Sequence, residues 1–158
     1  MRGVTKKERH SRAMEMITRV GLGDFADSFP YELSGGMSQR VAILRAFLMD
    51  PQVLLMDEPF GALDAQTRIL MREELLETWR TNPKTVIYIT HDIEEAVLLG
   101  DRILVMSGRP GTIRDEIPIT IPRPRNAAVH QHPEYDIIQE KVWNLIETEV
   151  RKDLGFKQ

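Results

Sequence analysis

The stretch Val53-Leu54-Leu55-Met56-Asp57-Glu58-Pro59 decides the fold, because a short apolar run ends there in two adjacent carboxylates. An uninterrupted run of this length is typical of a strand buried on both faces of a sheet. A second run, Thr85 to Thr90, is rich in β-branched residues, and Asp64 is placed to cap a helix between the two. The order strand, helix, strand predicts parallel pairing through a right-handed crossover, and hence an α/β fold.

Asp57 and Glu58 are placed where the first strand is expected to leave the sheet. In phosphoryl transfer, this position suits one carboxylate that holds Mg²⁺ and a second that orients or deprotonates water. Taken alone, two carboxylates at a strand end are weak evidence, since a solvated terminus or a helix cap explains them better. His91 follows the second strand, however, and ligands of open α/β sheets bind at the shared carboxyl edge. The sequence therefore favours a site at that edge.

A glycine pair precedes the first strand, within Leu33-Ser34-Gly35-Gly36-Met37-Ser38-Gln39-Arg40. Helical spacing runs from Ser38 to Met49 and ends at Asp50-Pro51. Ser34 offers a hydroxyl, and the two glycines offer unshielded backbone N–H groups, at a helix start where the dipole favours an anion. Ser-Gly-Gly is also a common turn, so the motif by itself leaves both interpretations open.

Four segments in order carry a family resemblance: LSGGMSQR at 33–40, VLLMDEP at 53–59, GALD at 61–64 and ITHD at 89–92. Together they resemble the signature, Walker B, D-loop and switch-histidine segments of ABC ATPases, in that family's order and at its usual separations. The resemblance implies a P-loop NTPase-like sheet with flanking helices, incomplete at the N-terminus, followed by a C-terminal β-hairpin and helix.

The resemblance also implies roles for individual residues. Asp57 would help to hold Mg²⁺, Glu58 would polarise the attacking water and His91 would contact the γ-phosphate. In that family two subunits enclose two ATP molecules, so that each site is built from both chains. The residues expected at the partner subunit's ATP and at the dimer interface are Ser34, Gly35, Gly36, Met37, Gln39 and Asp64.

Two later segments, Gly108-Arg109-Pro110-Gly111-Thr112-Ile113 and Ile121-Pro122-Arg123-Pro124-Arg125, resemble the C-terminal region of importer ATPases for nitrate, sulfonate or taurine. Met37 also resembles that subgroup. The implied partners are a second ATPase subunit in a homodimer, transmembrane permease subunits and, indirectly, a solute-binding protein. The implied location is peripheral, on the cytoplasmic face of the cell membrane.

The chain is expected to be one partial ABC ATPase domain over residues 1–158. Residues 5–50 form its helical and signature region, 51–107 its core, and 108–158 a C-terminal hairpin and helix. The hairpin is expected to pair 102–107 with 112–119 in antiparallel fashion at the edge of the sheet. Trp79 and Trp143 have aliphatic neighbours at helical spacing, which predicts core packing for both.

The composition excludes several classes of function. The 158 residues carry 21 Lys and Arg against 24 Asp and Glu, a net charge of −3, which argues against a nucleic-acid partner. Cysteine is absent, so disulfides and thiolate metal sites are excluded. The apolar runs are far shorter than the ~20 residues that cross a membrane. A membrane partner would therefore have to be another chain.

One expected motif, the phosphate-binding loop G-x-x-x-x-G-K-[ST], does not occur in the sequence, where no lysine follows a glycine. The resemblance places that loop ahead of residue 1. Losing three or more charge-assisted hydrogen bonds to phosphate, each worth about 1.5–3 kcal/mol, would cost on the order of 5 kcal/mol. We therefore expect that the chain alone neither binds nor hydrolyses ATP measurably, and that exposed apolar faces make it self-associate.

A second class of function fits the same motifs. The chain would then be a non-enzymatic protein that docks on an intact ATPase and offers Ser34-Gly35-Gly36 in trans. Co-purification with an ATPase only in the presence of ATP would favour this alternative.

Overall fold

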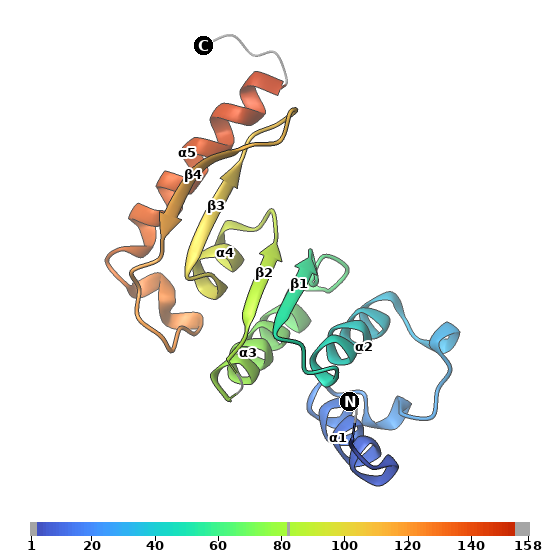
Figure 1. Ribbon diagram of the computed structural model, residues 1–158. Coiled ribbons are helices and arrows are strands. Elements are labelled where there is room, and N and C mark those ends of the chain that lie inside the picture. The colour runs from blue at the N-terminus through green and yellow to red at the C-terminus, as the bar shows by residue number, and fades with distance from the viewer. Residues whose placement is uncertain (1–2, 82, 154–158) are drawn as a thin grey trace. The chain divides into compact units, whose positions relative to one another are not determined.

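The computed structural model describes residues 3–81 and 83–153 (Figure 1). The chain forms two compact units, Met1–Ile89 and Thr90–Gln158, and each is described by itself. Their boundary falls within the segment 51–107 that was expected to form one core. Residues 154–158, at the end of the expected C-terminal segment, lie outside the described residues.

The first unit begins with helix α1 (Lys6–Arg19). Thr5 caps it, because its hydroxyl accepts from Glu8 N at 3.3 Å while Thr5 N donates to the Glu8 carboxylate at 3.0 Å. This reciprocal pair satisfies two amides that the helix leaves free. The helix ends at Arg19, and Gly21, two residues later, has a φ of 70° that glycine adopts without strain.

Two short 3-10 helices, Gly23–Phe25 and Pro30–Glu32, lead to helix α2 (Gly35–Leu48). This helix begins three residues before Ser38, where apolar spacing starts. The reason is the cap: Ser34 Oγ accepts from Met37 N at 3.2 Å and fixes the first turn. Apolar spacing reports only the buried face, so it does not detect a first turn made of two glycines.

Strands β1 (Val53–Asp57) and β2 (Thr85–Ile89) pair in parallel and flank helix α3 (Ala65–Thr81) in the chain. The register runs from Val53 opposite Thr85 to Asp57 opposite Ile89. The predicted strand, helix, strand unit is therefore confirmed. Asp57, as the last residue of β1, stands at the carboxyl end of the ladder.

The expectation that 53–56 is buried on both faces is wrong. Leu54 and Met56 are 5% and 6% exposed, whereas Leu55 is 72% exposed. Alternation along a strand places Val53 and Leu55 on one face, and the ladder adds Ile87 and Ile89 to it. All four side chains are more than half exposed, so no described part of the first unit covers this face. We call these four residues the open sheet face.

The second unit contains helix α4 (Ile93–Leu99), strands β3 (Arg102–Met106) and β4 (Ile113–Pro118), and helix α5 (Tyr135–Asp153). Strands β3 and β4 pair in antiparallel fashion, as predicted. In the described residues they form a sheet of their own rather than an edge of the β1–β2 sheet. Helix α5 packs along α4 and the hairpin (Figure 1).

Helix α5 buries one face, on which Ile138 and Val142 are 7% and 2% exposed. Trp143 follows Val142 and lies outside that face, with 54% of its surface exposed. Core packing of Trp143 was therefore a wrong prediction, and Trp79 in α3 is only partly buried. In the described chain, no helix is long and apolar enough to span a bilayer.

Candidate functional site

The first candidate element is the N-terminus of α2. Its first intrahelical bond runs from Ser38 N to Ser34 O at 2.8 Å, so the amides of Gly35 and Gly36 precede it, where N–H groups have no intrahelical acceptor. A Cβ added at Gly35 would meet no heavy atom within 4 Å. The backbone at Gly35 is thus open to close approach by a ligand oxygen, and the helix dipole favours an anionic one.

Gly36 faces the protein. A Cβ at this position would contact Leu63 Cδ2 at 3.4 Å and Ala62 O at 3.8 Å. Leu63 is 5% exposed, so the contact lies over packed structure. The two glycines therefore have different uses, since Gly35 leaves space outside the helix and Gly36 lets the helix start lie against the GALD segment, 61–64.

The two carboxylates stand where β1 leaves the ladder. Glu58 N continues the pairing by donating to Ile89 O at 2.9 Å, and Gly61 N then donates to Glu58 O at 3.1 Å to close a turn. Glu58 has a φ of +42°, a left-handed conformation that costs a non-glycine residue about 1–2 kcal/mol. Strain of this kind is concentrated at functional positions.

A side chain of the signature segment holds this turn. Gln39 Nε2 donates to Glu58 O at 3.2 Å, so the carbonyl of Glu58 accepts from both Gln39 and Gly61. Phe60 anchors the turn from inside, with 1% exposure and its ring centroid 6.1 Å from that of Tyr88. Sequence reasoning had not identified Phe60, although a large apolar residue directly after Glu58-Pro59 was a usable signal.

Asp64 caps α3, as predicted. Its carboxylate accepts from Thr67 N at 2.9 Å and from Thr67 Oγ1 at 2.7 Å. These hydrogen bonds, the backbone bond first, hold the pKa of Asp64 below its ordinary value of 3.8. Asp64 remains exposed while it caps the helix.

His91 belongs to the second unit and is exposed. Its neighbours are fixed by a small network, in which Asp92 N donates to Thr90 Oγ1 at 3.0 Å and Thr90 Oγ1 donates to the Glu95 carboxylate at 2.9 Å. Asp92 in turn caps α4 by accepting from Glu95 N. His91 thus precedes a helix whose first turn is firmly hydrogen bonded.

The structure brings together most of the predicted site residues. Eight of the nine share the first unit: Ser34, Gly35, Gly36, Met37, Gln39, Asp57, Glu58 and Asp64. Two of these eight are linked directly by the Gln39–Glu58 hydrogen bond, and Gly36 lies close to Ala62 and Leu63, the two residues before Asp64. His91 follows β2 in the chain and is held by the second unit.

The fit of Mg²⁺ depends on Asp57. Asp57 is exposed at the end of β1, and in the described residues no group of three or more His, Cys, Asp or Glu side chains gathers into a metal cluster. Mg²⁺ usually binds through one or two carboxylates together with water and substrate phosphates. One or two carboxylates at this edge fit a magnesium ion carried by a nucleotide better than a resident metal.

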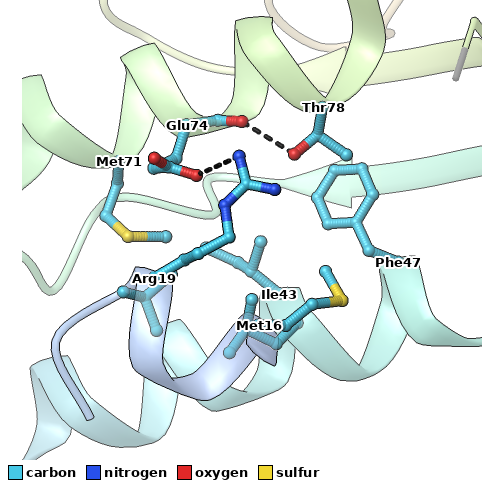
Figure 2. A pocket seen from close by; sticks show the side chains of 9 residues that line it. Met16, Arg19, Ile43, Phe47, Met71, Glu74 and Thr78 are labelled. Atoms are coloured by element: carbon cyan, nitrogen blue, oxygen red, sulfur yellow. Dashed lines mark hydrogen bonds and ion pairs between the residues drawn. The ribbon is translucent and has the colours of Figure 1, made fainter. Parts of the chain in front are cut away.

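A small pocket lies among α1, α2 and α3, away from these residues (Figure 2). Met16, Ile43, Phe47 and Met71 give it an apolar lining, and its interior of about 20 Å³ has room for roughly one water molecule. Arg19 closes it by an ion pair with Glu74 at 3.1 Å. The pocket is a gap in helix packing and is too small for a nucleotide.

Comparison with known proteins agrees with this geometry. A family model described as ABC transporter matches residues 2–61. The taurine import ATP-binding protein TauB of Rhizobium johnstonii is 57% identical over 111 residues, 70% of this chain and 42% of that protein. The nitrate import ATP-binding protein NrtD of Synechocystis sp. is 44% identical over 152 residues, 92% of this chain and 57% of that protein.

A solved structure is also similar: the dimeric, post-hydrolysis state of the ATP-binding cassette MJ0796 bound to ADP and Pi. It matches with a TM-score of 0.66 and 36% identity, and covers 77% of this chain and 52% of that one. The chain spans about half the length of the curated relatives that it matches. It belongs to the ABC transporter family, and several of its relatives are named as taurine or nitrate import ATP-binding proteins. The predicted fold class is thereby confirmed.

Proposed function

We propose that the chain provides the signature and Walker B elements of an ATP-hydrolysing subunit, which energises uptake of nitrate, sulfonate or a taurine-like solute by an ABC importer. The observation that carries this proposal is the Gln39–Glu58 hydrogen bond of 3.2 Å. It ties the anion-favouring helix start to the strained carboxylate turn within one unit. The names of the taurine and nitrate import relatives support the importer assignment.

The proposed chemistry assigns one task to each group. Asp57 holds Mg²⁺, which when bound neutralises charge on the transferred phosphate. Glu58 orients and polarises the attacking water, and His91 contacts the γ-phosphate. Ser34 Oγ and the amides of Gly35 and Gly36 face ATP held by a second subunit.

Three further site residues have supporting tasks. Gln39 positions the Glu58 turn, Met37 completes the first turn of α2, and Asp64 lies at the interface between subunits. The exposure of Asp64 supports an interface role, and the dimeric cassette MJ0796 supports assembly in pairs. ATP then acts as a ligand that stabilises the dimer.

The proposed partners are a second ATPase subunit in a homodimer, permease subunits in the membrane and, through them, a solute-binding protein. The proposed place of the chain is the cytoplasmic face of the membrane, as a peripheral subunit. Solutes of nitrate, sulfonate or taurine type fit the relatives' names.

We further propose that the 158-residue chain alone is inactive. A missing phosphate loop removes several charge-assisted donors, on the order of 5 kcal/mol, which lowers affinity several thousand-fold. Isothermal titration with Mg·ATP should give no measurable heat of binding. Mg²⁺-dependent turnover by the chain alone that disappears in Glu58→Gln would overturn this proposal.

The catalytic assignment is testable in a chimera, in which a relative's own segment with G-x-x-x-x-G-K-[ST] precedes residue 1. Glu58→Gln should lower its ATPase rate by roughly 10²–10⁴-fold and leave ATP binding intact. Glu73→Gln, the same change at an exposed position of α3, is the matched control and should leave the rate unchanged. An unchanged rate in Glu58→Gln would remove Glu58 from the catalytic role.

A second candidate function is a non-enzymatic partner that supplies the signature segment in trans. The observation that favours it is the open backbone at Gly35, which is formed by this chain without any phosphate loop. Co-purification with an intact ABC ATPase in Mg·ATP, and its loss in Ser34→Asp, would support this role. Equal recovery without nucleotide would refute it.

A further inference from the structure

The Ile121-Pro122-Arg123-Pro124-Arg125 segment, which the proposed chemistry leaves without a task, is tied to helix α4. Arg125 is among the most buried charged side chains of the described residues, with 3% side-chain exposure. Its Nη1 donates to the carbonyls of Gly100 and, at 3.4 Å, Val97. Its other nitrogens donate to Ile121 O at 2.8 Å and Ile119 O at 3.5 Å.

Arg123 reinforces the same contact. Its Nη2 donates to Leu99 O at 2.6 Å, and its Nε donates to Asp101 at 2.9 Å. The carbonyls of Val97, Leu99 and Gly100 belong to the C-terminal end of α4, where a helix leaves its last acceptors without partners. The two arginines therefore cap this helix end from a segment more than 20 residues away in sequence.

Burial lowers the pKa of Arg125 from its ordinary value, with a smaller contribution from neighbouring Arg123. A guanidinium still stays protonated at neutral pH. Its planar fork can reach several carbonyls at once, whereas a lysine ammonium acts as a single point of charge. The site is consequently specific for arginine.

Helix α4 has only seven residues, fewer than two full turns, and a helix this short does not persist by its own hydrogen bonds. It is held at both ends. Thr90, Asp92 and Glu95 form the network at its start, and the two arginines hold its end. His91 lies between Thr90 and Asp92 of this network in the chain, roughly 10 Å of helix away from the arginine cap.

We propose that Arg125, assisted by Arg123, is a positioning residue for His91, acting through α4 as a short rigid connection. This inference rests on the proposed function only for the task given to His91. The backbone on either side of His91 is held by hydrogen bonds within the second unit, whether or not a nucleotide is present.

The test is NMR spectroscopy of the isotopically labelled 158-residue chain, with the His91 imidazole signal assigned by its loss in His91→Gln. In Arg125→Lys, the His91 Cε1–H signal should shift, and the amides of residues 96–100 should exchange with solvent at least ~10-fold faster. The amides of α5 should keep the exchange rates of the parent chain. Arg102→Met, which removes only an exposed pair with Glu116 in the same unit, is the matched control and should change neither readout.

Two results would overturn the inference. One is an Arg125→Lys chain with unchanged His91 signals and unchanged exchange in α4. The other is faster exchange that extends equally over α4, the hairpin and α5, which would make Arg125 a general stabiliser of the unit. If Arg125→Lys does not fold, Arg123→Met gives the decision, because Arg123 is 39% exposed and loses only its bonds to Leu99 and Asp101. No readout needs ATP, so failure of the proposed ATPase would leave this test valid.

Discussion

Leu55→Lys should lower self-association of the chain and leave its stability nearly unchanged. Leu55 is 72% exposed and lies on the open sheet face with Val53, Ile87 and Ile89. Contiguous apolar faces of this kind are sites of association. Since the Leu55 side chain already contacts water, its replacement removes little packing from the fold.

The magnitude follows from the exposed fraction of Leu55. Burying a whole leucine side chain contributes about 1.5–3 kcal/mol, so the exposed 72% can contribute about 1–2 kcal/mol. When two copies meet through the same face, each contributes once, which gives about 2–4 kcal/mol. Dissociation of such a pair should become roughly 30- to 700-fold easier in Leu55→Lys.

Sedimentation velocity over a concentration series measures the dissociation constant, and urea denaturation checks that both chains fold equally well. Ser11→Lys is the matched control, since it adds the same charge at an exposed position of α1. It should leave association unchanged. A folded Leu55→Lys chain that associates as strongly as the parent would show that the open sheet face is not the contact.

Three further changes test the site. Asp64→Asn should make the stability of the chain depend less on pH in acid. Hydrogen bonds from Thr67 lower the pKa of Asp64 in the folded chain. The stability that the Asp64 carboxylate contributes is therefore present above the unfolded pKa of about 3.9 and is lost as pH falls through the lowered folded value. Thermal melts below pH ~5 check this, and the same loss of melting temperature in acid for both chains would contradict it. Gln39→Ala should cost about 1 kcal/mol in urea denaturation through the lost bond to Glu58 O; no loss would show that the bond is not populated in solution. Glu58→Asn should be about 0.5–1 kcal/mol more stable than Glu58→Gln in the same assay, because asparagine tolerates positive φ better, and the reverse order would refute strain at this position.

Local features of the fold could be predicted from sequence because they depend on neighbouring residues. Thr5 with Glu8, and Asp92 with Glu95, cap helix starts across three residues, a pattern that can be read directly in the sequence. The two strand-like runs indicated the parallel pair because a helix between two strands is the usual crossover that parallel pairing needs. Such signals are complete within a short window of sequence.

Other features of the fold depend on residues that are distant in the sequence. An apolar run shows that side chains favour burial, but the coverage of Leu55 depends on which other segments pack against it. Helical spacing likewise does not decide between adjacent positions, so that Val142 is buried and Trp143 exposed. The caps on α4 from Arg123 and Arg125 join residues more than 20 positions apart, which no periodic pattern records.

The site residues were predicted as separate motifs, and the structure links two of these motifs, the signature segment and the Glu58 turn, by a hydrogen bond. Glu58 is held in a strained conformation by its own ladder bond to Ile89 and by the Gln39 side chain on its carbonyl. Gly36 brings the start of the same helix against the GALD segment. In the proposed dimer, the N-terminus of α2 faces the partner's nucleotide while Glu58 serves its own. A shift of α2 caused by one nucleotide would therefore displace the carboxylate that acts on the other, which couples the two sites through Gln39.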